Sequence, residues 1–210
     1  MYTPATYYVK DLSVIEQFVR ENNFATLVSS DGKKPIATHI PLELERRENH
    51  TYLQGHVARA NPQWQTFRTD SDVLAIFTGP HTYISPRWYN HVNVPTWNYM
   101  SAHLYGKTRL VEDCEEVFAM LKRLVDRYEA NAANPPYQME TLASEFLEKE
   151  MRGIVAFEIK IEHIEASFKL SQNRNSQDFE NIIKELENRG DAESKQIAQA
   201  MREHQPHWQK

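Results

Sequence analysis

The chain has 210 residues, of which 40% are hydrophobic and 25% are charged, as in an ordinary soluble globular protein. Its net charge of −5 argues against broad nonspecific nucleic-acid binding, which depends on Lys and Arg that neutralise phosphates. The single cysteine, Cys114, excludes a disulfide framework and any multi-thiolate metal centre. No run of membrane-spanning length and no export leader is visible, so we expect a cytoplasmic protein without membrane association.

The first third of the chain predicts one helix followed by strands. Asp11 can cap a helix whose apolar side chains share one face. Strands are then expected at residues 24–29, 35–45 and 52–57. Asp31-Gly32 is a hairpin signal between the first two of these strands. Asn61 is expected to cap a short helical turn that has Pro62 at its first position.

The middle of the chain predicts the centre of a sheet. Residues 73–77 are apolar on both faces, which is typical of a central strand, and residues 81–85 continue this strand or pair with it. A loop follows at 87–96. Residues 97–111 then alternate between apolar and polar side chains, as a long half-buried strand does.

The last third mixes helices with one late strand. Asp113 and Glu116 form a capping-box-like start for a helix with a clear apolar stripe. The remaining elements are a helix at 139–149, a strand at 154–161 and two tail helices separated by Gly190.

Strands predominate early, with short turns, and a sheet of six or more antiparallel strands tends to close because closure removes exposed edges. The sequence therefore predicts a mainly β (α+β) fold, a β-barrel with peripheral helices. We expect residues 1–175 to form the barrel domain and residues 176–210 to form a helical extension packed on it.

Polar and aromatic motifs recur at the predicted strand ends, where a core does not need them. They are Thr38-His39-Ile40-Pro41, Gly55-His56-Val57-Ala58-Arg59-Ala60-Asn61-Pro62, Tyr83-Ile84-Ser85-Pro86-Arg87-Trp88-Tyr89, Pro95-Thr96-Trp97-Asn98-Tyr99 and Lys169-Leu170-Ser171-Gln172-Asn173-Arg174. Such donors and flat rings suit a pocket for a planar, phosphorylated ligand. The six glycines are too far apart for a Rossmann or P-loop motif, so side chains and turn amides must hold any phosphate.

Together with Phe77-Thr78-Gly79-Pro80, these motifs resemble, in order, the PaiB family of FMN-binding negative transcriptional regulators. The resemblance runs from Met1 to about Arg174. One departure is Met100-Ser101-Ala102-His103, where a pair of valines is expected near the histidine. The resemblance implies an FMN-binding split β-barrel, a homodimer with the flavin near the subunit interface, and negative regulation of protease production and sporulation.

Arg59 and Asn61 are candidates for the phosphate of the flavin, because a guanidinium and the amides of a turn bind anions. The alternative is that Asn61 only caps the turn and Arg59 forms a surface salt bridge. Ser85 and Arg87 are further phosphate candidates, while Trp88 could cover the isoalloxazine ring; the alternative is an aromatic corner packed under a loop.

The remaining candidates each have a structural alternative. Trp97 and Asn98 could stack on the flavin and bind its uracil-like edge, or only pack across strands. The motif that contains Lys169, Gln172 and Arg174 could bind an anionic ligand or an adjacent subunit, or form a solvated turn.

Thr38, His39 and His56 belong to the first two motifs and are expected to contact the ligand. His39, His56 and His103 lack the spacing of a metal site, so we expect barrel histidines or ligand contacts and no bound metal. No catalytic constellation is recognisable either. We therefore expect a regulator, and keep as the alternative a flavin-dependent oxidoreductase or flavin reductase of the split-barrel type.

DNA is a candidate partner, contacted directly or through another molecule. Residues 176–210 contain seven acidic and five basic side chains, whereas a recognition helix needs a basic face. If contact is direct, we expect it at two hairpin ends. The cations there are Lys33, Lys34, Arg46 and Arg47.

Overall fold

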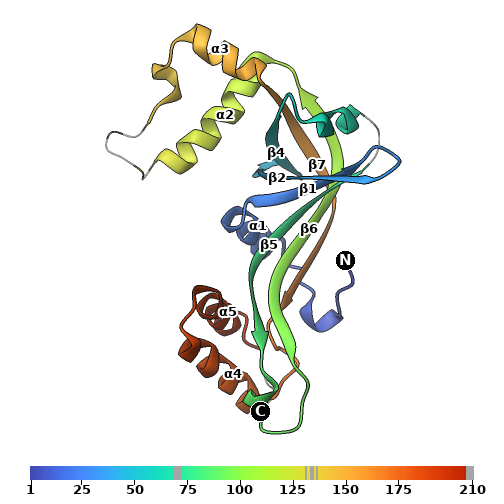
Figure 1. Cartoon of the computed structure of the whole chain (residues 1–210), viewed down its shortest axis with the longest axis vertical. Coiled ribbons are helices and arrows are strands. Elements are labelled where there is room, and N and C mark those ends of the chain that lie inside the picture. Colours follow the sequence, from blue (N-terminus) through green and yellow to red (C-terminus); the bar gives the residue numbers. More distant parts are fainter. Residues whose placement is uncertain (69–71, 131, 133–134, 136, 207–210) are drawn as a thin grey trace. The chain divides into compact units, whose positions relative to one another are not determined.

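The computed structural model describes residues 1–68, 72–130, 132, 135 and 137–206. Within them, seven strands form one sheet in the order β2-β1-β5-β6-β7-β4-β3 (Figure 1). The strands are β1 (Phe24–Ser30), β2 (Pro35–Pro41), β3 (Glu43–Arg47), β4 (His50–Ala58), β5 (Val73–Ile84), β6 (Thr96–Val111) and β7 (Ile154–Lys169).

Helices accompany the sheet in the described part of the chain. The α-helices are α1 (Leu12–Glu21), α2 (Cys114–Glu129), α3 (Ser144–Arg152), α4 (Ser176–Arg189) and α5 (Ala192–Glu203). The short 3-10 helices are η1 (Ala5–Tyr7), η2 (Pro62–Arg68), η3 (Pro86–Trp88) and η4 (Met139–Thr141). No helix among the described residues is long and apolar enough to cross a membrane.

Local sequence signals account for where the helices begin. The carboxylate of Asp11 accepts from the N–H of Ser13 at the start of α1, and that of Asp113 accepts from Glu116 at the start of α2. Gly190 ends α4 with a φ of +77°, a left-handed conformation that glycine adopts without strain. These predicted caps are confirmed.

The chain passes from one edge of the sheet to the other through a single residue, Leu42. β2 pairs antiparallel with β1 at one edge, and β3 pairs antiparallel with β4 at the other. The side chain of Leu42 is buried, and its N–H donates to the carbonyl of Asn23 at 2.9 Å. Because one residue joins the two edge strands, the sheet has to curl and close as a barrel. The predicted mainly β barrel with peripheral helices is thereby confirmed.

Two predicted elements are wrong in their boundaries. The single strand expected at 35–45 is divided into β2 and β3, because Leu42 turns the chain away from β1. The helix expected at 139–149 begins only at Ser144. The backbone of Leu142 is extended, with a ψ of 147°, and separates η4 from α3. The late strand expected at 154–161 is confirmed and continues to Lys169.

The residues group into two compact units. Unit 1 contains Met1–Asn22, Phe77–His103 and Glu165–Lys210, and unit 2 contains Asn23–Ile76 and Leu104–Ile164. β5, β6 and β7 each contribute residues to both units. The predicted boundary at residue 175 stays a prediction, because this grouping assigns residues on both sides of it to unit 1.

In unit 1, the two C-terminal helices pack through apolar faces. α4 and α5 lie side by side (Figure 1). Their buried apolar side chains are Phe179, Ile182, Ile183, Leu186, Ile197, Ala198, Ala200 and Met201. Burial of this stripe holds the pair of helices in place, as the hydrophobic spacing predicts.

In unit 2, a buried carboxylate joins several elements. Glu158 of β7 accepts from Arg47 of β3 at 2.8 Å and from Arg109 of β6 at 3.0 Å. Arg109 also donates to Glu116 of α2 at 2.6 Å. Burial alone would raise the pKa of Glu158, but the hydrogen bonds from Arg109 and Arg47 outweigh it and hold the pKa of this carboxyl below its ordinary value.

The Gly106→Ala variant should be strongly destabilised. A Cβ at position 106 would lie 2.0 Å from the carbonyl oxygen of Lys160, and the backbone of a neighbouring strand cannot move aside. We expect a loss of about 3 kcal/mol, the upper end of the range for overpacking, measured by urea unfolding. Gly55→Ala is the control, because its Cβ would meet the rotatable end of the Leu42 side chain at 2.6 Å. Equal losses in the two variants would contradict the argument.

Stability should depend on the ionisation of Glu158. Its folded pKa lies below the unfolded value, so its contribution is complete above the unfolded pKa and is lost as the pH falls through the folded pKa. Glu158→Gln should lower the free energy of unfolding at neutral pH by roughly 1.5–3 kcal/mol and flatten the acid side of the pH profile. Glu162→Gln, an exposed position on the same strand, should change neither property. An unchanged acid profile in the Glu158 variant would refute this account.

Candidate functional site

The predicted site residues are divided between the two units. Unit 2 contains Thr38, His39, His56, Arg59 and Asn61. Unit 1 contains Ser85, Arg87, Trp88, Trp97, Asn98, Lys169, Gln172 and Arg174. Each group is described below within its own unit.

Thr38 and Asn61 bond to each other and to Gln63 inside unit 2. The Asn61 amide donates to Thr38 Oγ1 at 2.9 Å, and the Thr38 hydroxyl donates to Gln63 Oε1. Gln63 is completely buried and donates to the carbonyl of Leu27 at 3.0 Å. These bonds join β1, β2 and η2. Asn61 also caps the turn, as the structural alternative expects, because its Oδ1 accepts from the N–H of Gln63 at 3.0 Å.

Arg59 holds the end of α3. Its Nε donates to the carbonyl of Arg152 at 2.7 Å, and its Nη2 donates to the carbonyl of Ile154 at 2.8 Å. We expect the turn that follows Arg59 to present free backbone N–H groups, but two of these groups have partners. The N–H of Asn61 donates to Ala58, and that of Gln63 donates to Asn61 Oδ1. Two N–H groups of the turn and two of the Arg59 guanidinium therefore already have partners within unit 2.

His39 and His56 take no part in the hydrogen bonds of Thr38, Asn61 and Arg59. His39 is exposed, bonds to Thr26 through Nδ1 at 3.0 Å and stacks on Phe24 with ring centres 6.5 Å apart. His56 is half-buried, and burial lowers its pKa. Among the described residues, no three His, Cys, Asp or Glu side chains gather as a metal site would require.

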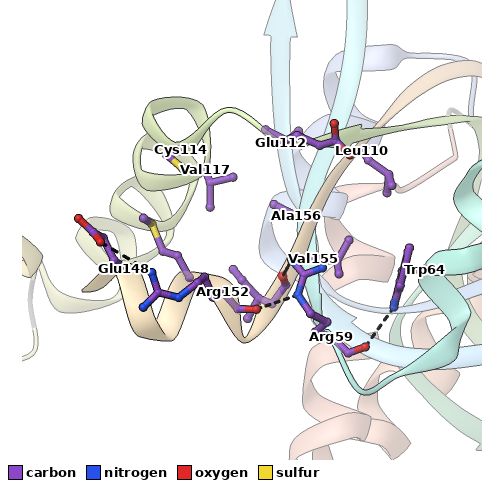
Figure 2. A pocket seen from close by; sticks show the side chains of 13 residues that line it. Arg59, Trp64, Leu110, Glu112, Cys114, Val117, Glu148, Arg152, Val155 and Ala156 are labelled. Atoms are coloured by element: carbon purple, nitrogen blue, oxygen red, sulfur yellow. Dashed lines mark hydrogen bonds and ion pairs between the residues drawn. The ribbon is translucent and has the colours of Figure 1, made fainter. Parts of the chain in front are cut away.

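A cavity of about 520 Å³ lies in unit 2 between α2, α3 and the adjoining strand ends. Arg59 and Trp64 lie on one side of this space, and Cys114 and Val117 of α2 lie on the other (Figure 2). Val155 and Ala156 at the start of β7 also line it. Of the residues that line this cavity, the sequence predicts only Arg59 as a site residue. The apolar residues on α2 and β7 have the spacing of an ordinary hydrophobic core.

In unit 1, the residues around Pro86 form a short corner. Ser85 caps η3, since its Oγ accepts from the N–H of Arg87 at 3.2 Å. The guanidinium of Arg189 lies 5.9 Å from the ring centre of Trp88. Trp97 is 52% exposed and contacts Tyr83 edge-on, with ring centres 6.1 Å apart. The exposed part of Trp97 leaves a surface on which a ligand ring could stack.

Asn98 and Gln172 satisfy internal groups of unit 1. Asn98 is completely buried; its Oδ1 accepts from the Ser171 hydroxyl at 3.1 Å. Gln172 accepts from the N–H of Leu170 at 2.7 Å and donates to the carbonyl of Phe168 at 2.5 Å. These bonds shape the turn after β7, which includes Ser171 at a φ of +62°.

Lys169 and Arg174 lie together in unit 1, with Tyr89 and Thr96. We call these four residues the Lys169–Arg174 cluster. Lys169 Nζ donates to the hydroxyl of Thr96, and burial together with the charge of Arg174 lowers the pKa of Lys169. The guanidinium of Arg174 lies 4.8 Å from the ring centre of Tyr89.

Tyr89 was predicted only as part of an aromatic motif, yet it has the most informative polar atom of the cluster. Its side chain is 8% exposed, and its hydroxyl has no hydrogen-bond partner among the described residues. A buried hydroxyl without a partner is unfavourable. Cations and O–H donors are groups from which a phosphate monoester accepts hydrogen bonds, and the cluster combines both kinds.

Comparison with known proteins gives a family. A family model described as "Putative FMN-binding domain" matches residues 1–163. The chain is 45% identical over 201 residues to "Protease synthase and sporulation protein PAI 2" of Bacillus subtilis, with 96% of each chain covered. It is also 28% identical over 244 residues to "Uncharacterized protein AN0679" of Emericella nidulans, with 97% of each covered.

Solved structures share the fold at low sequence identity. A FAD and heme binding protein from Mycobacterium smegmatis has a TM-score of 0.59 and 14% identity, covering 78% of this chain and 73% of that one. The flavocytochrome Anf3 from Azotobacter vinelandii has a TM-score of 0.58 and 14% identity, covering 83% and 75%. The expected split-barrel fold is confirmed by these likenesses.

Proposed function

The chain belongs to the FMN-binding domain family, and we propose that it binds FMN and acts as a negative transcriptional regulator of protease production and sporulation. The match along almost the whole chain to the Bacillus subtilis protein carries this proposal, because protease synthase and sporulation are the words of that relative's name. We also propose that the protein is a homodimer, as the resemblance of its motifs implies, and that it works in the cytoplasm.

The Lys169–Arg174 cluster supports a place for the phosphate of FMN in unit 1. The phosphate would accept from Lys169 and Arg174, and the buried hydroxyl of Tyr89 would gain an acceptor. The exposed part of Trp97 offers an aromatic surface in the same unit. When bound, FMN would supply the redox chemistry of its isoalloxazine ring.

Lys169→Met should weaken FMN and leave riboflavin, which has no phosphate, nearly unchanged. Loss of one charge-assisted hydrogen bond corresponds to roughly 1.5–3 kcal/mol, or about 10- to 100-fold in Kd. Quenching of flavin fluorescence during titration measures both affinities. FMN affinity should also fall with rising pH sooner than for an ordinary lysine, because the pKa of Lys169 is lowered and its charge is lost earlier.

Lys184→Met is the matched control, since Lys184 is an exposed lysine of the same unit. It should bind both flavins as the unmodified protein does. Equal losses for FMN and riboflavin in the Lys169 variant would assign Lys169 a structural role. No quenching of FMN by the unmodified protein would refute flavin binding itself.

Any direct DNA contact is proposed to lie outside α4 and α5. Arg202 of α5 pairs with Glu187 of α4 at 2.9 Å, and Arg189 donates to the carbonyl of Tyr83 at 2.9 Å. These cations already have partners, and the tail is acidic overall. Among the cations at the hairpin ends, Arg47 is a poor candidate for DNA contact, because it is paired with Glu45 and Glu158. Lys33 and Lys34 stay exposed.

Gel shifts on promoters of protease and sporulation genes test this placement. Replacing both Lys33 and Lys34 by Gln should weaken binding and reduce the slope of log K against log salt by about 4, since the proposed homodimer carries four such lysines and each phosphate contact contributes about 1. Replacing Lys184 and Lys195, both exposed in the tail helices, should have no effect. Loss of binding only in the tail variant would show that a tail helix reads DNA. Light scattering on each variant checks that the proposed dimer is retained.

A further inference from the structure

The cavity of unit 2 has a mostly apolar wall that the flavin proposal does not use. At about 520 Å³ it is within the size range of pockets that bind small molecules. Its floor includes Val111, Val117 and Ala156, which belong to a buried apolar cluster, and Met151 and Ile154 pack against that cluster while partly exposed. A ligand with an apolar body would cover this surface.

Arg59 provides one fixed cation at the edge of this apolar space (Figure 2). Its Nε donates to the carbonyl of Arg152 at the end of α3, its Nη2 donates to that of Ile154 at the start of β7, and its backbone N–H donates to that of Gly153 at 2.8 Å. A guanidinium has five N–H donors, so these contacts leave three for a ligand. Among the described residues, no carboxylate forms an ion pair with Arg59.

The other charged side chains that line the cavity determine how much negative charge a ligand can carry there. Glu112 and Glu148 also line the space, and Arg152 lies 3.7 Å from Glu148. Two carboxylates near a single uncompensated guanidinium disfavour a dianion such as the FMN phosphate. One negative charge, placed against Arg59 and followed by an apolar chain or ring, matches the lining.

We propose that this cavity binds an apolar molecule that carries one carboxylate, with the carboxylate on Arg59 and the apolar part between α2 and β7. This second site shares no residue with the Lys169–Arg174 cluster and gives the regulator a way to respond to an organic acid.

The single cysteine of the chain makes the test specific, because Cys114 lines the cavity and is exposed. In the full-length protein, decanoate should slow the alkylation of Cys114 by iodoacetamide in a saturable way. Decanol has the same chain without the charge and should protect at least roughly 10-fold less effectively, since it cannot form the charge-assisted bond. Arg59→Gln should remove this difference, raising the decanoate concentration needed by about 10- to 100-fold.

Arg46→Gln is the matched control, because it removes the same charge from an exposed position of unit 2 that does not line the cavity. It should leave protection by decanoate unchanged. Absence of protection at millimolar decanoate, or equal protection by decanol in the unmodified protein, would overturn the proposal even if Arg59→Gln failed to fold. Protection of Cys114 by FMN would show that the cavity is part of the flavin site, which overturns the second site while supporting flavin binding.

Discussion

The connection through Leu42 is the constraint on which unit 2 depends. A single residue separates strands that lie at opposite edges of the sheet, so these two edges must meet at this corner. The corner at Leu42 also leaves little room for a side chain on the neighbouring strand β4. Gly55 of β4 faces it, where any side chain would meet Leu42 Cδ2 at 2.6 Å and the carbonyl of Pro41 at 3.3 Å. A buried leucine and a glycine without a side chain together let two strands meet at the corner.

Once the barrel of unit 2 is closed, polar side chains fix its parts by bonds to the backbone and to one another. Gln63 ties η2 to β1, Arg59 ties the end of β4 to the end of α3, and Glu158 joins β3, β6 and β7. Buried polar groups are tolerated here because each has partners. Tyr89 in unit 1 is different, since its buried hydroxyl has none among the described residues, and this is why it points to a ligand.

The sequence predicted most elements because periodicity and capping are local signals. It did not predict the break at Leu42, since residues 35–45 alternate without a glycine. The break arises because the two halves of this segment pair with different strands, β1 and β4. For the same reason, Thr38, Asn61, Asn98 and Gln172 were candidate ligand contacts although they bond internally. A sequence shows that a polar side chain lies at a strand end, but its partner is known only in three dimensions. Conversely, the cavity residues looked like ordinary core.

The one-residue corner also orders the events of folding. The β1–β2 and β3–β4 hairpins join close sequence neighbours, so each can close early and independently. Pairing of β4 with β7 is different, because Tyr52 meets Lys160 only after the chain between them, including α2 and α3, has been brought round. The entropy of closing this long loop is lost before the pairing compensates for it. We therefore expect the two hairpins to act as preformed halves, and the arrival of β7 to set the rate of barrel formation.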